Sequence, residues 1–297
     1  MRRLALHGVL LASLSCGAGS APQTDFDGGQ ALVYAASQVA FGPRVPGTEG
    51  HRRAGDWILE QLRRKTDSVT VQAWTHVTAD GDTLPLRNLI GHIRPEMLER
   101  VLYVAHWDTR PVADSESNMA DRQRPILGAN DGASGVALLL ALADALRNTP
   151  PRVGVDLAFV DGEDYGDWNS RTDVLLGSRY FAARLDTTRL PLFAVVWDMV
   201  AARDLRFTKE SNSVHGAPEV VDRVWRVARE LGYGRVFVDE RGGAVTDDHI
   251  PLLEAGVRAI DVIGLPYAHW HTLEDTMDKI GAESLQIVGD VAVALVR

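Results

Sequence analysis

The sequence has almost no cysteine, no excess of basic residues and no long hydrophobic run. Cys16 is the only cysteine in 297 residues, so no disulfide can form within the chain. The 31 basic and 40 acidic residues give a net charge of −9. Such a balance excludes the broad basic surface that nucleic-acid binding needs. The mostly apolar run over residues 4–14 is shorter than the ~20 residues of a transmembrane helix.

That short run has the features of an export signal. Arg2 and Arg3 precede it, and small residues follow it. Cys16 stands in a Leu-Ser-Cys-Gly context that resembles a lipoprotein processing site, although Ser13 occupies the place where leucine is usual. We expect residues 1–26 to be a signal peptide and tether. The protein would then be exported to the periplasm or the outside, either lipid-anchored at Cys16 or simply secreted, with the anchor its only membrane contact.

The rest of the chain has the composition of a globular domain, with 45% apolar and 24% charged residues. Strands are expected at residues 68–76, 86–93, 101–106, 155–160, 192–197, 235–238 and 258–263. Helices are expected at residues 30–41, 49–64, 132–147, 178–184, 218–231, 248–255 and 282–296. This alternation predicts an α/β fold, a three-layer sandwich with a central, mostly parallel mixed sheet flanked by helices. No linker interrupts it, so residues 27–297 form one predicted catalytic domain.

Metal-competent side chains stand where the predicted strands end or just before a helix. They are His106, Asp131, Asp164, Asp198 and His271. Because ligands of open α/β sheets bind at the carboxyl ends of the strands, we expect these side chains to converge. Imidazole and carboxylate without thiolate favour a catalytic zinc site over a closed structural one, although another divalent ion would also suit them.

Two neighbouring acids suggest further roles. Glu163, beside Asp164, can face the substrate as a general acid or base. Asp108 can orient the imidazole of His106 from behind. Each residue also has an ordinary structural interpretation; Asp131 alone could be a helix N-cap. Asp204 and Glu210 are interpreted as surface residues.

The motifs follow one family's order. They are His106-Trp107-Asp108, Gly-Ala-Asn-Asp131-Gly, Asp-Gly-Glu163-Asp164, Trp-Asp198-Met and Trp270-His271-Thr272. Over about residues 30–297 the chain resembles the zinc aminopeptidase family that also contains the animal-type glutaminyl cyclases. The resemblance implies one zinc ion on Asp131, Asp164 and His271 for a cyclase. For an aminopeptidase, His106 and Asp198 would complete a second zinc site.

Several segments resemble the cyclase branch. Asp247-Asp248-His249-Ile250-Pro251 matches a cyclase run, and Trp168 and Trp270 match pocket tryptophans. Two positions depart from the family, because Asp164 replaces the usual glutamate and Thr246 a pocket glutamine. The resemblance implies an acyltransferase that converts N-terminal glutamine to pyroglutamate and releases ammonia.

In that reaction Glu163 would move the proton and Asp198 would support it. Asp247 would hold the α-amine, while Trp168, Trp270 and Thr246 would line the substrate pocket. The substrates would be the N-termini of peptides or proteins, with no nucleic-acid partner, and we expect a monomer.

Two alternatives remain at this point. In a zinc aminopeptidase, Glu163 would activate water for attack on the first peptide bond. A non-catalytic, peptidase-like binding domain is the second alternative, and it predicts lost ligands.

Overall fold

The computed structural model describes residues 24–297. The predicted signal peptide therefore lies outside the described residues except for residues 24–26, and so does Cys16. The described chain opens with α1 (Gly28–Val39) and α2 (Glu49–Lys65). The Thr48 hydroxyl caps α2 by accepting the His51 N–H at 3.3 Å, which satisfies one of the free donors of the first turn. Within residues 24–297, no helix combines the length and the apolar character that a membrane span requires.

The central sheet has six strands in the order β1-β2-β4-β3-β5-β8. Their bounds are β1 (Ser68–Val77), β2 (Thr83–Ile93), β3 (Arg100–His106), β4 (Gly154–Val160), β5 (Phe193–Asp198) and β8 (Ala259–Ile263). The hairpin strands β1 and β2 run antiparallel, whereas β4, β3, β5 and β8 are mutually parallel. The predicted α/β fold with a mixed, mostly parallel sheet is therefore confirmed.

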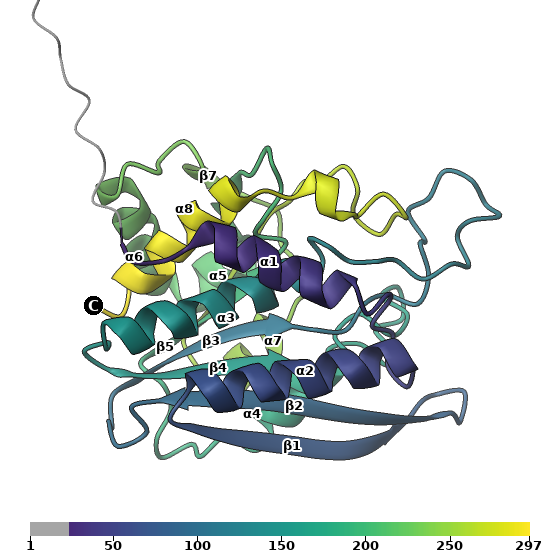
Figure 1. Ribbon diagram of the computed structural model, residues 1–297, viewed down its shortest axis with the longest axis horizontal. Helices are drawn as coiled ribbons and strands as arrows, with labels where there is room; N and C mark the ends of the chain where they lie inside the picture. Colours follow the sequence, from purple (N-terminus) through teal and green to yellow (C-terminus); the bar gives the residue numbers. More distant parts are fainter. Residues whose placement is uncertain (1–23) are drawn as a thin grey trace, which may run out of the picture.

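Helices cover both faces of this sheet (Figure 1). One face carries α1, α2, α3 (Ala133–Asn148) and α8 (Ala282–Ala294), and the other carries α4 (Leu176–Ala182) and α7 (His249–Glu254). Strand β3 shows why both faces are needed: Val101 and Tyr103 join one hydrophobic cluster, and Leu102 and Val104 join the other. A continuous apolar run thus indicates a strand that is buried on both of its faces.

The chain departs from the predicted alternation between β5 and β8. Here it forms β6 (Phe207–Lys209), α5 (Ser211–Gly216), α6 (Pro218–Glu230) and β7 (Phe237–Arg241). The strand expected at residues 235–238 forms as β7, but it pairs with β6 in a separate two-stranded sheet. The interpretation of Glu210 as a surface residue is wrong, because it is 2% exposed and its carboxylate accepts N–H bonds at the start of α5. A short 3₁₀ helix (Met277–Lys279) precedes α8.

Candidate metal and catalytic site

The candidate site lies where the central parallel strands end. Strand β3 runs between β4 and β5, so the strand order reverses around it. His106 is the last residue of β3, Asp198 is the last residue of β5, and Asp164 follows the end of β4. A crevice outside the carboxyl ends of strands at such a switch point is the usual ligand site of an open α/β sheet.

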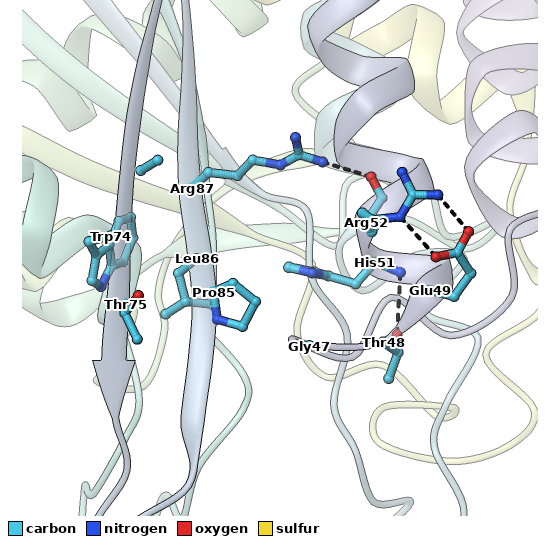
Figure 2. A pocket seen from close by; sticks show the side chains of 11 residues that line it. Gly47, Thr48, Glu49, His51, Arg52, Trp74, Thr75, Pro85, Leu86 and Arg87 are labelled. Carbon is cyan, nitrogen blue, oxygen red and sulfur yellow. Dashed lines mark hydrogen bonds and ion pairs between the residues drawn. The ribbon is translucent and has the colours of Figure 1, made fainter.

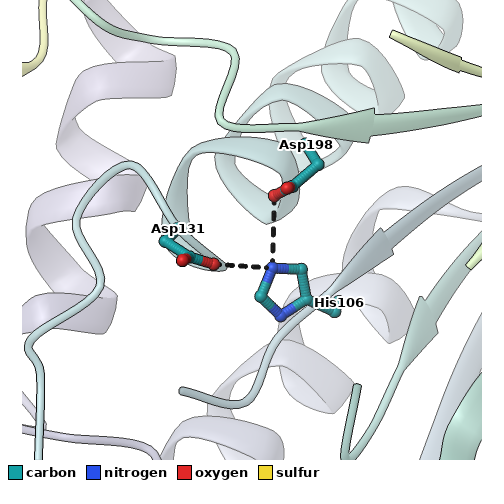
Figure 3. A group of neighbouring side chains, drawn as sticks. All are labelled: His106, Asp131 and Asp198. Carbon is teal, nitrogen blue, oxygen red and sulfur yellow. Dashed lines mark hydrogen bonds and ion pairs between the residues drawn. The ribbon is translucent and has the colours of Figure 1, made fainter. Parts of the chain in front are cut away.

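Five buried side chains form two groups that share Asp131. In the first group, Nε2 of His106 lies 3.1 Å from Oδ1 of Asp131 and 3.2 Å from Oδ1 of Asp198 (Figure 3). In the second group, Nε2 of His271 lies 3.4 Å from Oδ2 of Asp164 and 3.7 Å from Oδ2 of Asp131. The structure thus brings together all the metal-competent residues that the strand ends indicated.

Asp131 is positioned through its backbone. The Asp275 carboxylate accepts the N–H groups of Asn130 at 2.9 Å and Asp131 at 3.0 Å. Arg44, which is fully buried, donates to the carbonyls of Trp107, Leu127 and Gly128. The N-cap of α3 is Gly132, without a side-chain bond, so the Asp131 carboxylate is not used as a helix cap.

Asp164 presents its two oxygens differently. Oδ1 accepts bonds from Arg110 Nη1 and Trp168 Nε1, both at 2.9 Å. Oδ2 is buried and has no hydrogen-bond partner among the described residues. Burial alone would raise the pKa of Asp164, but His271 and Arg110 outweigh it and hold that pKa below its usual value. Asp164 is therefore an anionic candidate ligand whose Oδ2 has no hydrogen bond within the described residues.

The ring of His271 is held through Nδ1, the nitrogen that does not face Asp164. Nδ1 lies 3.0 Å from Oδ1 of Asp114. Burial disfavours the charged imidazole, but Asp164 and Asp114 outweigh burial and raise the pKa of His271 to about 10. A carboxylate on Nδ1 directs Nε2 toward a metal.

Glu163 lies at the edge of both groups and is 8% exposed. Its Oε2 is 3.7 Å from Nδ1 of His106. Burial and the neighbouring carboxylates raise the pKa of Glu163 well above its ordinary value, which suits a group that both accepts and returns a proton. Asp108 accepts the N–H groups of Glu163 and Asp164 at 3.1 and 3.2 Å. It lies 3.6 Å from His106 Nδ1, too far for a hydrogen bond, so it orients the backbone of the acidic pair rather than the imidazole.

Side chains of both candidate ligand groups, together with Glu163, line a cavity of about 370 Å³. Trp270 stands at its mouth, 43% exposed, with its ring stacked 3.9 Å from that of His271. The residues proposed from the sequence for substrate contact all line this cavity: Trp168, Thr246, Asp247 and Trp270. Asp247 is buried, which raises the pKa of its carboxyl.

A second, larger cavity of about 590 Å³ lies between the start of α2 and strands β1 and β2 (Figure 2). Its charged side chains already neutralise one another, with Arg52 paired to Glu49 at 2.6 Å and Arg87 paired to Asp56 at 2.7 Å. None of the candidate metal ligands lines it. We therefore place the reaction at the smaller cavity.

Sequence reasoning assigned no role to several supporting residues, namely Arg44, Arg110, Asp114 and Asp275. Each lies in a loop without hydrophobic periodicity, and each acts on a segment far away in the chain. Asp114, for example, contacts a histidine 157 positions later. No local pattern marks such a partner.

Known proteins resemble this chain in sequence and in fold. Residues 88–296 match the model of peptidase family M28. Bovine glutaminyl-peptide cyclotransferase is 24% identical over 269 residues, covering 80% of this chain and 73% of the bovine protein. The structure of Bacteroides thetaiotaomicron glutaminyl cyclase bound to N-acetylhistamine matches with 37% identity and a TM-score of 0.88, covering 93% of this chain and 98% of that chain. A Zn-dependent exopeptidase from Parabacteroides distasonis matches with 35% identity and a TM-score of 0.88, covering 93% and 99%.

Proposed function

Since this chain belongs to peptidase family M28, which confirms the resemblance seen in its motifs, we propose that it is a zinc-dependent glutaminyl-peptide cyclotransferase. It would convert an N-terminal glutamine of a peptide or protein to pyroglutamate and release ammonia. The observation that carries the proposal is the small cavity in which Glu163 and Asp247 lie with Trp168 and Trp270. A small, tryptophan-lined pocket suits one terminal side chain folded back on its own amine.

The donor set fits zinc. Asp131, Asp164 and His271 are buried ligands with no thiolate among them, and the free Oδ2 of Asp164 faces His271. Three protein ligands with an open position are typical of catalytic zinc. When bound, zinc would polarise the side-chain amide carbonyl of the substrate and stabilise the charge that develops on its oxygen.

The chain's own residues would carry out the proton transfers. Glu163 accepts a proton as the α-amine nitrogen bonds to the side-chain amide carbon, and it returns that proton to the departing amide nitrogen. One carbon–nitrogen bond forms, one breaks, and ammonia leaves. The buried Asp247 holds the α-amine, and Asp198, which lines the same cavity, supports Glu163.

The remaining cavity residues would confine the substrate. Trp168 and Trp270 wall the pocket, and Thr246 lines it beside Asp247. Cyclisation requires the amine and the amide to stay close together, and a tight pocket lowers the entropic barrier to that arrangement.

An aminopeptidase is the second candidate, favoured by one specific observation. His106 and Asp198 lie with Asp131 in a group that could hold a second metal ion. In that enzyme Glu163 would take a proton from the water molecule that attacks the first peptide bond. The similar Parabacteroides protein is described as an exopeptidase.

Mass spectrometry separates these candidates. A Gln-initiated peptide is incubated with the zinc-loaded protein, and a loss of about 17 Da, the mass of ammonia, indicates cyclisation. Release of free amino acid with a shortened peptide indicates the aminopeptidase. A zinc-loaded protein that gives neither product would support the binding-domain alternative. The matched control is Glu163→Gln, which we expect to bind zinc and leave the peptide unchanged.

We also propose that the enzyme acts outside the cytoplasm as a monomer. The location outside the cytoplasm follows from the leader-like residues 1–26 and from the cysteine at position 16. Fractionation of cells that express the full chain or its Cys16→Ala variant tests the anchor. Release of the variant from the membrane fraction supports lipidation, and equal distribution of both forms supports simple secretion.

A further inference from the structure

The segment that follows β3 contacts two proposed ligands from behind. We propose that Arg110 and Asp114 form an ion-pair bridge that positions Asp164 and His271, so that metal affinity depends on residues outside the ligand set. The inference rests on the zinc site of the proposed function, and it holds for a cyclase or an aminopeptidase alike.

Arg110 is the centre of the bridge. It is 4% exposed, and its Nη1 donates to Oδ1 of Asp164 at 2.9 Å. Its Nε donates to Oδ2 of Asp114 at 3.0 Å, and Nη2 bonds to the same oxygen. A planar guanidinium can hold two carboxylates at fixed angles, whereas the single ammonium group of a lysine is a compact point charge.

The first arm of the bridge decides which oxygen of Asp164 can bind a metal. Arg110 and Trp168 together occupy Oδ1, and Oδ2 has no hydrogen-bond partner among residues 24–297. The carboxylate is thereby fixed as a one-oxygen ligand. The positive charge of Arg110 also opposes the repulsion between Asp164 and the nearby carboxylate of Asp131.

The second arm fixes the ring of His271. Asp114 contacts Nδ1, and the Ser115 N–H donates to the His271 carbonyl at 3.2 Å. Glu116 accepts the N–H of Leu273 at 2.9 Å. His271 has a φ of 56°, in the left-handed region that costs a non-glycine residue energy unless its surroundings hold it. The same short segment therefore holds both the backbone and the ring of this ligand.

The bridge acts on only part of the cluster. Asp131 is supported separately, through Asp275 and Arg44. In the described part of the chain, Nδ1 of His106 has no hydrogen-bond partner. Loss of the bridge should therefore weaken the site of Asp164 and His271 and leave the other positions in place.

The test measures zinc affinity by competition with a chromophoric chelator, using the full chain. Arg110→Met removes the charge and keeps most of the side-chain volume, and we expect zinc to bind about 10- to 100-fold more weakly, as when other outer partners of metal ligands are removed. Asp114→Asn should weaken binding by about tenfold. Arg110→Lys should recover part of the loss. The control is Arg124→Met, which removes an exposed ion pair to Asp121 in the same loop and should leave affinity unchanged.

Three results distinguish positioning from general stability. The unfolding midpoint of zinc-free Asp114→Asn should stay near that of the parent chain, because this side chain is 43% exposed. The double variant Arg110→Met with Asp114→Asn should lose less affinity than the two single losses combined, because both changes break one bridge. Parental zinc affinity in both single variants would overturn the inference; if Arg110→Met does not fold, parental affinity in Asp114→Asn does so alone. A chain that binds zinc through the bridge but forms no pyroglutamate would refute only the proposed function.

Discussion

The two groups of candidate ligands that share Asp131 are built differently. In the His106 half, formed by His106 and Asp198, the imidazole contacts both carboxylates directly at 3.1 and 3.2 Å. In the His271 half, formed by Asp164 and His271, the closest corresponding contact is 3.4 Å, and Arg110 and Asp114 hold both ligands from outside. In the His106 half the side chains contact one another, whereas in the His271 half outer residues hold the side chains and Oδ2 of Asp164 has no hydrogen bond within the described residues.

The two halves also differ in the groups that surround them. Burial disfavours a charged His106, but Glu163 and the surrounding carboxylates outweigh burial and hold the pKa of His106 well above its usual value. The pKa of His271 is raised too, so the charge of the imidazole does not distinguish the two halves. The His271 half leaves Oδ2 of Asp164 unsatisfied within the described chain. This oxygen fits the zinc ion that we propose for the His271 half.

The largest expected effect comes from Glu163, which adjoins both halves. Glu163→Gln keeps the shape of the side chain but removes the proton acceptor, so kcat should fall about 10²- to 10⁴-fold. Zinc content, measured by atomic absorption, should not change, since Glu163 belongs to neither ligand group. Turnover close to that of the parent enzyme would contradict the assigned role.

Removing one histidine from each half tests the contrast directly. We expect His271→Ala to weaken zinc binding by more than the ~100-fold expected for an outer partner, because a ligand itself is lost. His106→Ala should retain one zinc ion per chain. Chelator competition and metal analysis measure both quantities. Two zinc ions in the parent chain, with one lost in His106→Ala, would instead favour the aminopeptidase.

Much of this contrast could not be predicted from the sequence. Most of the candidate ligands could be found because they stand at or just after the ends of apolar runs that predict buried strands, as His106 ends β3 and Asp198 ends β5. The bridge could not be found in this way. Arg110 lies in a loop, and its target Asp164 is 54 positions away, so only the folded chain reveals the contact. Strand β6 was not predicted either, because its three residues are too few to show an alternating pattern.

Glu210 is a buried carboxylate that belongs to neither half of the site, so it serves as a comparison for the carboxylates there. Burial alone would raise its pKa, but His249 and the N–H groups of Asn212 and Val245 lower it from 4.5 to about 2. Its folded pKa is depressed, so its contribution to stability is present above pH 4.5 and is lost as the pH falls toward 2.

Glu210→Gln should therefore lower the free energy of unfolding by about 2 kcal/mol at pH 7. Urea titrations of the parent chain and the variant should show this difference shrinking below pH 4.5. Zinc affinity should not change, because Glu210 lies in neither ligand group. A stability difference independent of pH would show that the charge of Glu210 is not its source.

The smallest expected effect concerns Trp270, which links the His271 half to the substrate cavity. Its ring stacks on His271 and lines the mouth of the cavity, so Trp270→Ala should remove contacts that bind substrate and transition state equally. KM for a Gln-dipeptide should rise about tenfold while kcat changes little. Trp270→Phe, which keeps an aromatic ring over the imidazole, should recover most of the loss. A fall in kcat together with a loss of zinc would mean instead that the tryptophan acts mainly through the ligand beneath it.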